Sequence, residues 1–262
     1  MDLQLAGKKV LVTGSTAGIG FAAALEFAAE GASVVINGRT QERVDRAIAE
    51  IRKAHPGAHV SGVASDVSNA AGCATLVQAV PQVDVLVNNM GIFEPKPFEQ
   101  IPDADWLRLF EANVMSGVRL SRNYLSSMRE KNWGRIIFVS SESAVQIPAE
   151  MIHYGMTKTA QVAVARGVAE SLAGTGITVN SVLAGPTRSE GVETFIAQMG
   201  GGGNSTAFET EFFKNIRPTS LLKRFETTEE VAHMIVYLCS PLASATTGAA
   251  VRVDGGVVRA IL

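Results

Sequence analysis

The stretch KKVLVTGSTAGIG, residues 8–20, decides the fold of this chain. It begins with a short apolar run, Lys8 to Val12, which is typical of a buried strand, and continues into a glycine-rich turn. The residues that follow, among them Phe21, Leu25 and Ala28, have the apolar spacing of a helix. Glycines at such a turn let the backbone approach a pyrophosphate at the positive end of the helix. They are also needed simply to turn the chain, so the stretch alone indicates a strand-turn-helix unit.

The same rhythm of strand, turn and helix repeats along the chain and predicts a parallel sheet. Near-continuous Val, Ile and Leu suit strands that are buried on both faces, and right-handed crossovers give a doubly wound sheet. We therefore expect an α/β fold: a doubly wound, Rossmann-like parallel sheet of seven strands with helices on both faces. The expected strands are Lys8–Val12, Ser33–Asn37, Val60–Ala64, Val83–Val87, Arg135–Val139, Thr178–Val182 and Ala250–Val253.

Capping and breaking residues mark the expected helix boundaries. The first helix ends at Gly31, and a second, marked by Val44, Ile48 and Ile51, ends near Pro56-Gly57. Asp103 is expected to cap a third long helix. Two further helices are expected over Glu150 to Ala173 and over Thr228 to Leu238, the latter with Thr227 or Thr228 as its N-cap.

Length and composition indicate one globular domain over residues 1–262. With 47% apolar residues, 18% charged residues and a net charge of −2, nothing favours nucleic acid or anionic lipid as a partner. Cys73 and Cys239 cannot form the disulfide framework of a secreted domain, and we expect both to be buried free thiols. No apolar run approaches a membrane span and no signal peptide precedes the first strand, so we predict a cytoplasmic protein.

One segment, residues 186–224, interrupts the rhythm and is predicted to be an insertion within the single domain. Its run Gly200-Gly201-Gly202-Gly203-Asn204 indicates a mobile loop, and apolar side chains flank the run. We expect this insertion to be a substrate-covering loop and helix; the alternative is a surface insertion with a small core of its own. The apolar residues are Phe195, Ile196, Met199, Phe208, Phe212 and Phe213.

The glycine spacing G-x-x-x-G-x-G fits neither the G-x-G-x-x-G fingerprint nor a P-loop. With Thr13 it resembles instead the nucleotide motif of the short-chain dehydrogenases/reductases, compact single domains of about 250 residues. The resemblance extends in order through the whole chain. It implies the following cofactor-binding residues: Gly14, Ser15, Thr16, Gly18, Ile19 and Gly20 in the turn, Asp66 and Val67 after the third strand, Asn89 and Gly91 within Asn88-Asn89-Met90-Gly91, and Gly185, Pro186 and Thr187 at the nicotinamide, with Thr247-Gly248 and Val253-Asp254-Gly255-Gly256 as the closing motif.

The resemblance also implies four catalytic residues, Asn113, Ser141, Tyr154 and Lys158, of which Tyr154 and Lys158 also bind the cofactor. Tyr154 and Lys158 are four apart on a predicted helix, so they share a face, and a nearby ammonium favours the phenolate. In the family's mechanism Tyr154 gives a proton to the carbonyl oxygen during reduction and takes it back during oxidation. Lys158 lowers the Tyr154 pKa and holds the nicotinamide ribose. Ser141, rather than its neighbour Ser140, hydrogen-bonds the developing alkoxide, and Asn113 holds a water that links Lys158 to solvent.

Two residues depart from the family's pattern. Met90 stands where the family usually has Ala, which changes packing. Ala184 stands where it usually has Pro, which removes a constraint on φ just before Gly185 and leaves the path of residues 186–189 open.

The end of the second strand decides the cofactor, because an acid there would hydrogen-bond a ribose 2′-hydroxyl and repel a 2′-phosphate. This chain has Asn37-Gly38-Arg39-Thr40 instead. Arg39 can pair with a 2′-phosphate, so we expect a preference for NADP(H), with NAD(H) possible. The alternative is that Arg39 is a solvated charge at a helix cap. Ala17, where some NADP-preferring relatives carry a second basic residue, weakens the preference.

Rival functions find less support in the sequence. A serine hydrolase lacks its G-x-S-x-G elbow around Ser141. His153 precedes Tyr154 on the helix and points elsewhere, so we expect it in a pocket wall or in contact with a residue of the site. His55 and His59 flank Pro56-Gly57 without a cysteine cluster, so we predict no metal. A non-catalytic dinucleotide sensor stays open, although all four catalytic residue types are retained.

The substrate is expected to be a hydrophobic or moderately polar ketone or aldehyde and the corresponding alcohol. Its expected walls are mostly apolar: Phe93, Gln146, Ile147, Met151 and residues 186–213. The alternative is a 3-oxoacyl thioester on acyl carrier protein, for which Arg129, Lys131 and Arg135, interrupted by Glu130, are the candidate docking residues. The family resemblance implies a homotetramer, and the apolar ending Val257 to Leu262 suits burial against another subunit.

Overall fold

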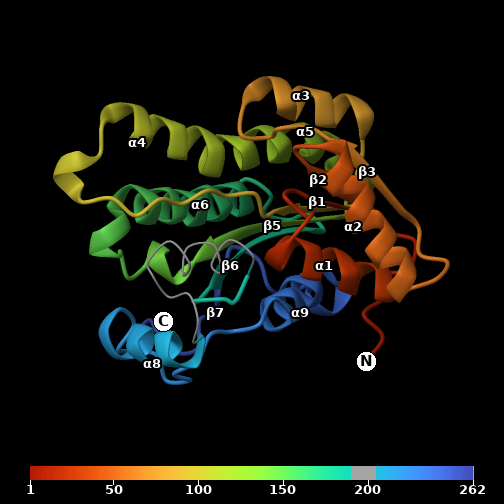
Figure 1. The fold of residues 1–262 in the computed structure, drawn as a ribbon. Coiled ribbons are helices and arrows are strands. Elements are labelled where there is room, and N and C mark those ends of the chain that lie inside the picture. Colours follow the sequence, from red (N-terminus) through yellow and green to blue (C-terminus); the bar gives the residue numbers. More distant parts are fainter. Residues whose placement is uncertain (190–204, 262) are drawn as a thin grey trace.

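The strands form one parallel sheet in the order β3-β2-β1-β4-β5-β6-β7 within the part of the chain, residues 1–189 and 205–261, that the computed structural model describes. The predicted α/β fold with seven parallel strands is confirmed, and the expected strand boundaries are right to within a few residues (Figure 1). The strands are β1 Lys9–Val12, β2 Ser33–Gly38, β3 Val60–Ala64, β4 Val85–Asn88, β5 Gly134–Ser141, β6 Ile177–Ala184 and β7 Ala250–Val253.

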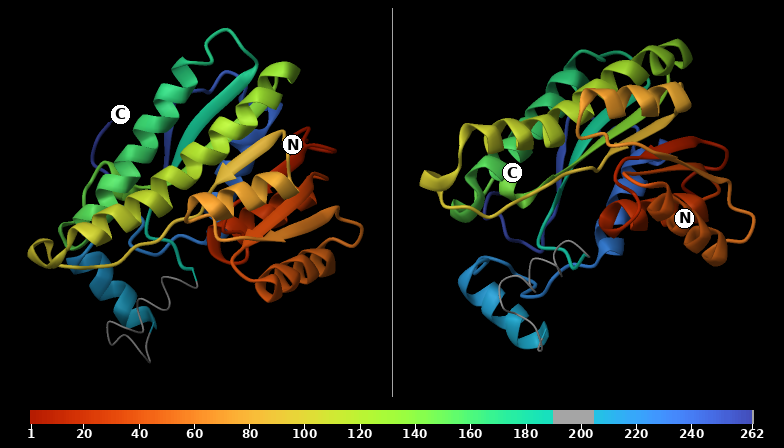
Figure 2. Two further views of the ribbon diagram at one scale, coloured as in Figure 1. Left: turned by 90° about the horizontal axis from the view of Figure 1, so that it is seen from above. Right: turned by 45° about the horizontal axis from the view of Figure 1, so that its top comes forward.

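Helices cover both faces of this sheet (Figure 1). One face carries α1, α2 and α9, and the other carries α3, α4, α5 and α6, with α4 and α5 running beside α6 (Figure 2). The helices are α1 Gly18–Ala29, α2 Gln41–Ala54, α3 Ala70–Ala79, α4 Asp103–Phe110, the π-helical turn η2 Glu111–Met115, α5 Ser116–Lys131, α6 Ile152–Glu170, α8 Ser205–Asn215 and α9 Thr228–Cys239, with short 3₁₀ turns η1 Phe98–Gln100, η3 Glu142–Ala144, η4 Ala149–Met151 and η5 Pro241–Ala243.

Each face of the sheet packs against its own apolar core, which explains why the strands are apolar without interruption. Val10 and Val12 of β1 and Val34 of β2 pack under α1, α2 and α9, whereas Leu11 and Val35 pack under the helices of the opposite face. Successive side chains of a strand point to opposite faces, so a strand covered on both sides must be apolar at every position.

The strand order reverses between β1 and β4, which lie side by side in the middle of the sheet. In an open parallel sheet, ligands bind in the crevice at the carboxyl ends of the strands where the order reverses. The fold therefore directs the ligand to the turns that follow β1 and β4.

Helix caps follow the sequence in one place and depart from it in another. Thr227 caps α9 as expected: its Oγ1 accepts a hydrogen bond from Glu230 N, and the Glu230 carboxylate accepts one from Thr227 N. Asp103 was expected to cap the third long helix, and this is wrong, because Pro102 is the N-cap and Asp103 is the first residue of α4. As an acid in the first turn, Asp103 still complements the helix dipole.

The C-terminal segment is more buried within its own chain than we expected. The Asp254 carboxylate accepts hydrogen bonds from Gly256 N and Val258 N, and Val257 and Val258 are buried. We expected another subunit to bury these two valines, and this is wrong, because their own chain buries them. Ile261, by contrast, is exposed. Among the described residues, no helix combines the length and apolar composition that crossing a bilayer requires.

Glu226 fastens the chain that returns from α8 to the end of β6. Its backbone pairs with Thr187 in a parallel bridge, donating to Pro186 O at 2.9 Å and accepting from Arg188 N at 2.8 Å. Its carboxyl Oε2 accepts from Gly185 N at 3.2 Å, whereas the buried Oε1 has no hydrogen-bond partner among the described residues. Burial raises the pKa of Glu226 to about 8.

Replacing Glu226 with Gln is expected to stabilise the protein in a pH-dependent way. The unfolded chain ionises this carboxyl near its ordinary pKa of 4.5. Since the folded chain holds it neutral to about pH 8, stability is lost as the pH rises between these values. Glu226→Gln should therefore raise the Tm by about 5 °C at pH 8 and change it little at pH 5.

Thermal denaturation of both proteins at several pH values measures this difference. Glu50→Gln, at an exposed position of α2, serves as the control and should shift the Tm equally little at every pH. A Tm difference for Glu226→Gln that does not grow with pH would contradict a neutral, buried carboxyl.

Candidate active site

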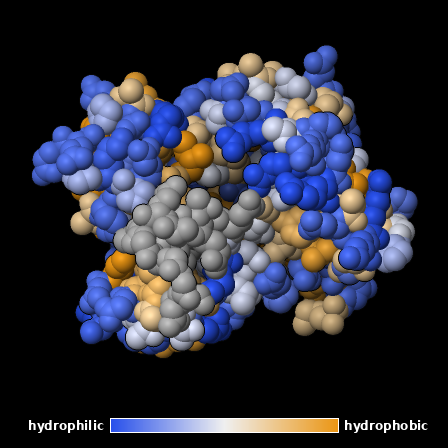
Figure 3. Space-filling view, in the orientation of Figure 1, coloured by the Kyte–Doolittle hydropathy of each residue, from blue (hydrophilic) through white to orange (hydrophobic). Residues whose placement is uncertain are grey.

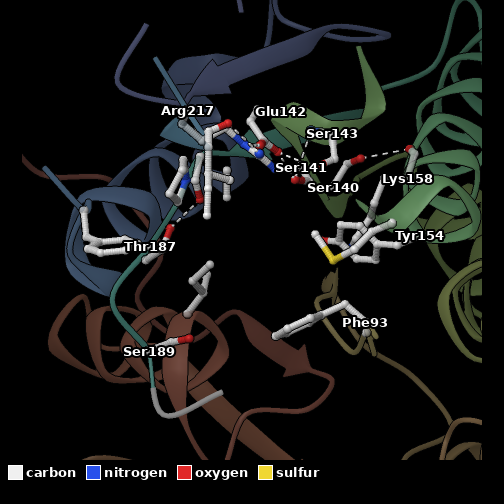
Figure 4. A pocket seen from close by; sticks show the side chains of 18 of the residues that line it. Phe93, Ser140, Ser141, Glu142, Ser143, Tyr154, Lys158, Thr187, Ser189 and Arg217 are labelled. Atoms are coloured by element: carbon white, nitrogen blue, oxygen red, sulfur yellow. Dashed lines mark hydrogen bonds and ion pairs between the residues drawn. The ribbon is translucent and has the colours of Figure 1, made fainter. Parts of the chain in front are cut away.

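A cavity of about 540 Å³ opens at the carboxyl ends of β4, β5 and β6. In the space-filling view hydrophilic residues dominate this face of the molecule, and apolar residues show at the hollow near its centre (Figure 3). Tyr154 and Phe93 lie on one side of the open space and Thr187 on the other, with Glu142 and Arg217 between them (Figure 4). Of the predicted site residues, those that line the cavity are Ile19, Asn89, Gly91, Ser141, Tyr154, Lys158, Gly185, Pro186 and Thr187.

Tyr154 and Lys158 lie one turn apart on α6, as their spacing predicts. The Lys158 Nζ is 5.6 Å from the centre of the Tyr154 ring and donates a hydrogen bond to Val139 O at 2.9 Å. Lys158 is buried, and burial lowers its pKa to about 8. The ammonium therefore lies at the floor of the cavity, close to the phenol.

Tyr154 is held as a protonated phenol. Burial raises its pKa above the ordinary 10, and the Glu142 carboxylate raises it further, whereas the nearby Ser141 hydroxyl and the charge of Arg217 lower it. We expected Lys158 to lower this pKa; in the structure the net shift is upward because burial outweighs the favourable contacts. The Phe93 ring packs edge-on against Tyr154, with the ring centres 6.0 Å apart.

The two serines at the end of β5, Ser140 and Ser141, have different hydrogen-bond partners. Ser140 Oγ donates to the carbonyl of Lys158 at 2.9 Å and so ties α6 to β5. Ser141 Oγ donates to Glu142 Oε2 at 2.5 Å and accepts from Ser143 N at 3.1 Å. Ser140 thus has a structural partner in the helix backbone, whereas Ser141 belongs to a polar cluster at the cavity wall.

Asn113 is fully buried in the π-helical turn η2, behind the cavity rather than in its lining. Its Oδ1 accepts from Ile92 N at 2.7 Å, and its Nδ2 donates to Ile92 O and to Thr157 Oγ1. At Gly91, an added Cβ would lie 3.4 Å from Lys158 Nζ and 3.6 Å from Asn113 Oδ1. The structure therefore brings Asn113 and Lys158 to the same glycine, and π-turns often occur at functional sites.

The glycine turn after β1 is locked against the turn after β4. Asn89 Nδ2 donates to Thr13 O at 2.9 Å and to Gly14 O at 3.1 Å, and Thr13 Oγ1 accepts from the N–H groups of Asn89 and Met90. A Cβ at Gly20 would lie 2.4 Å from Asn89 Nδ2, so only glycine fits this contact.

The same turn fits a dinucleotide pyrophosphate. Gly14 and Gly18 both have φ of +60°, a conformation that other residues rarely adopt. The N-cap of α1 is Ala17, which provides no side-chain acceptor for the first N–H groups of the helix. These N–H groups are therefore left for an anion at the positive end of the dipole.

At the end of β2, Arg39 is the first side chain to reach solvent. Asn37 is buried, with its Nδ2 donating to Ser65 Oγ at 3.0 Å and its Oδ1 accepting from Gly14 N at 3.3 Å, and Gly38 has no side chain. Arg39 is exposed and makes no hydrogen bond or ion pair with any described residue. Its guanidinium is therefore available to a ligand at the edge of the turn.

Four predicted cofactor residues differ in what they can offer a nucleotide. The Asp66 side chain is exposed and accepts from Ser68 N at 3.1 Å. Val67 and Ser15 are buried, and Ser15 Oγ donates to Val12 O at 2.7 Å, so these two side chains hold the turns. Thr16 packs where a Cβ at Gly38 would lie.

The turn at Gly185 takes a defined path without the family's proline. Ala184 continues β6 and pairs in register with Val253, and Gly185 N donates to Val253 O at 2.7 Å. A Cβ at Gly185 would lie 2.5 Å from Glu226 Oε1, so the close approach of Glu226 requires glycine here. Thr187 Oγ1 donates to Gly185 O at 2.9 Å, which turns the chain back toward the cavity.

Our expectation of an apolar substrate wall is wrong on one side of the cavity. Three charged side chains, Glu142, Glu150 and Arg217, line it together, and Arg217 bridges the two carboxylates. Gln146 and Ile147 do not line it. The one signal in the sequence was Glu142 itself, an acid directly after a strand whose residues are otherwise uncharged beyond Arg135.

The apolar side of the cavity is as expected and includes part of the insertion. Phe93, Met151, Phe212, Ile216 and Phe225 line it. The aromatic rings of α8 also form a small core of their own with Phe225, so the described part of the insertion combines both of our alternatives. The glycine run and Phe195, Ile196 and Met199 lie outside the described residues. His153 does not line the cavity; its ring packs edge-on against Trp106.

Comparison with known proteins gives consistent results. The sequence model described as Enoyl-(Acyl carrier protein) reductase matches residues 14–258. YvaG of Bacillus subtilis (strain 168), described as an uncharacterized oxidoreductase, is 50% identical over 263 residues that span 100% of both chains. The 3-oxoacyl-[acyl-carrier-protein] reductase FabG of Aquifex aeolicus (strain VF5) is 33% identical over 98% of this chain and 100% of its own.

A solved structure agrees over the full length. L-sorbose reductase from Gluconobacter frateurii, complexed with NADPH and L-sorbose, superposes with a TM-score of 0.93 at 30% identity and covers 100% of both chains. Together with the ordered motifs and the fold, these matches show that the chain belongs to the short-chain dehydrogenase/reductase family of oxidoreductases.

Proposed function

We propose that this protein is an NADP(H)-dependent oxidoreductase that interconverts a ketone or aldehyde and the corresponding alcohol, with Tyr154 as the acid and base. The observation that carries the proposal is the meeting of Ser141, Tyr154 and Lys158 in one cavity whose other wall is the turn Gly185 to Thr187. A dinucleotide with its pyrophosphate on the glycine turn would have its nicotinamide beside that wall.

Each residue has a role that its surroundings support. The dinucleotide would supply or accept the hydride. Tyr154, kept protonated by burial, gives its phenolic proton to the carbonyl oxygen as the negative charge develops there. Lys158, the buried cation beside the phenol, favours the phenolate that remains and lies within reach of a ribose. Ser141 holds the reacting oxygen, and Asn113 holds the water that links Lys158 to solvent.

Arg39 supports the preference for NADP(H). It is exposed, unpaired within the described residues, and close to the glycine turn, and no acid precedes it at the end of β2. A guanidinium binds a phosphate through paired hydrogen bonds, and an absent carboxylate removes the repulsion of a 2′-phosphate.

Acyl-carrier-protein substrates remain the second candidate function, supported by the similarity to FabG. One of the expected docking residues is excluded, because Arg135 is 2% exposed and donates to Gly176 O and Ser240 O inside the fold. Lys131 is engaged with Asp84, which leaves Arg129 as the remaining candidate. A dinucleotide sensor without activity ranks last, since all four catalytic residue types are present.

Tyr154→Phe is expected to abolish turnover while leaving cofactor binding intact. The variant removes the phenolic hydroxyl and retains the ring, so packing against Phe93 is kept. Ketone-dependent loss of NADPH absorbance should fall by at least about 1,000-fold, and NADPH affinity, from fluorescence titration, should stay within about threefold. Retained turnover would disprove the role of Tyr154.

Arg39→Ala is expected to weaken NADPH binding about tenfold and leave NADH binding unchanged, because it removes a charge-assisted contact that only the 2′-phosphate makes. Fluorescence titration with both cofactors measures this. Arg46→Ala, at an exposed position of α2, the helix that follows Arg39, is the matched control and should change neither affinity. If Arg39→Ala weakened NADPH binding and NADH binding equally, Arg39 would not be binding the 2′-phosphate.

We also propose a homotetramer, since Leu107, Leu221 and Leu222 expose apolar surface near α4 and β7 that association would cover. Light scattering should give four chain masses, and a monomeric mass would remove this proposal. A cytoplasmic location remains a prediction from the sequence.

A further inference from the structure

The charged cluster in the cavity wall has a defined geometry. Arg217 Nε donates to Glu142 Oε1 at 2.7 Å, and Arg217 Nη1 donates to Glu150 Oε1 at 3.0 Å. The side chains of Glu142 and Arg217 are 4% and 9% exposed, whereas that of Glu150 is 44% exposed, toward the mouth of the cavity. Burying two charges at a cavity wall is costly unless they are fully paired, so this arrangement calls for a reason beyond stability.

Glu142 also accepts a hydrogen bond from the Ser141 hydroxyl. Its second oxygen, Oε2, accepts from Ser141 Oγ at 2.5 Å and from Ser143 Oγ at 2.6 Å. A hydroxyl has one hydrogen to donate. While Ser141 donates to Glu142, it cannot donate to a carbonyl oxygen, which is the role that reduction requires of it.

The cluster carries one excess negative charge, since two carboxylates surround one guanidinium. The Glu142 and Glu150 carboxylates outweigh the effect of burial and raise the pKa of Arg217, so the guanidinium stays charged. Its Nη2 makes no hydrogen bond to any residue in the described ranges and remains a donor at the cavity wall. An anionic substrate group would meet the excess negative charge, whereas a neutral hydroxyl could both donate to Glu142 and accept from Arg217.

We propose that Glu142 and Arg217 select an uncharged substrate with a hydroxyl group on the carbon next to the reacting carbonyl, and that this hydroxyl replaces Ser141 on the Glu142 carboxylate. Ser141 is then released to donate to the carbonyl oxygen. The reaction is the reduction of an α-hydroxy ketone to a vicinal diol, or its reverse. The inference rests on the proposed function and specifies its substrate class.

The distances agree with neighbouring carbons. Ser141 Oγ hydrogen-bonds Glu142 Oε2 in the structure and would hydrogen-bond the reacting oxygen at a similar length. Glu142 Oε2 and the reacting carbonyl oxygen would therefore each lie one hydrogen-bond length from Ser141 Oγ. Oxygens on adjacent carbons are separated by about one hydrogen-bond length, so a vicinal hydroxyl can reach Glu142 while the carbonyl oxygen stays at Ser141 and Tyr154. The apolar side of the cavity, with Phe93 and Phe212, takes the remaining carbon skeleton.

A matched series of aryl ketones tests the proposal: acetophenone, α-hydroxyacetophenone and benzoylformate, in which the group bonded to the reacting carbonyl is methyl, hydroxymethyl or carboxylate. The enzyme variant is Glu142→Gln. Its amide oxygen can still accept from Arg217, so the fold is retained, while its NH₂ group cannot accept a hydrogen bond from Ser141 or from the substrate hydroxyl.

Glu142→Gln should lower kcat/KM for α-hydroxyacetophenone about 10- to 100-fold relative to acetophenone, the loss typical of a charge-assisted hydrogen bond. Because each ketone is compared between two enzymes, differences in intrinsic reactivity cancel. Benzoylformate should be a poor substrate of the natural protein and should improve in the variant, which has lost a negative charge. Glu170→Gln breaks an exposed ion pair with Arg166 on the same helix as Tyr154 and should change none of these ratios.

A binding measurement gives a second readout. Phenylethane diol should bind the protein saturated with NADP⁺ about tenfold more tightly than phenylethanol, and this difference should vanish in Glu142→Gln. An unchanged ratio of the two ketones in the variant, or equal binding of diol and alcohol to the natural protein, would overturn the inference while the proposed function stands. Absence of turnover with every ketone would instead refute the proposed function, and the inference with it.

Discussion

The close approach of two turns, one after β1 and one after β4, is the constraint on which the rest of this structure depends. Asn89 reaches across the point where the strand order reverses and binds the carbonyls of Thr13 and Gly14, and Gly20 leaves it room to do so. This contact fixes the start of α1, whose uncapped N–H groups then face the crevice. It also sets Gly91 beside Lys158, so the glycine turn after β1 and the cavity around Lys158 are directly connected.

The chemical site combines apolar burial with a few charges that are each held in place. Burial lowers the pKa of Lys158 to about 8 and raises that of Tyr154, which leaves a neutral phenol close to a cation that loses its proton readily. Glu142 and Arg217 add a second polar centre that the hydride chemistry itself does not require. The cavity is therefore asymmetric, with aromatic side chains on one side and a paired charge on the other, which suits a substrate with an apolar body and a hydroxylated end.

Local signals allowed most of the fold to be predicted from the sequence. Strands buried on both faces are apolar without interruption, so all seven could be located, and ordered glycine, Asn-Asn and Tyr-Lys motifs located the cavity residues. The Asp103 cap failed because an acid stabilises the first turn of a helix nearly as well as its cap. Glu142 and Arg217 were missed because they are 75 residues apart, and no local pattern pairs them. Arg135 was taken for surface because arginine is rarely buried, yet backbone carbonyls and the Trp133 ring surround it.

The central claim is that this chain transfers a hydride directly between a nicotinamide and a carbonyl carbon in the cavity of Tyr154. The most direct measurement is a single reduction with NADPH that carries deuterium at the transferable position of the nicotinamide, followed by mass spectrometry of the alcohol. The account predicts one deuterium bound to the carbinol carbon, delivered to one face only. An alcohol without deuterium, or tightly bound NADPH that keeps its label in the presence of every ketone, would contradict it.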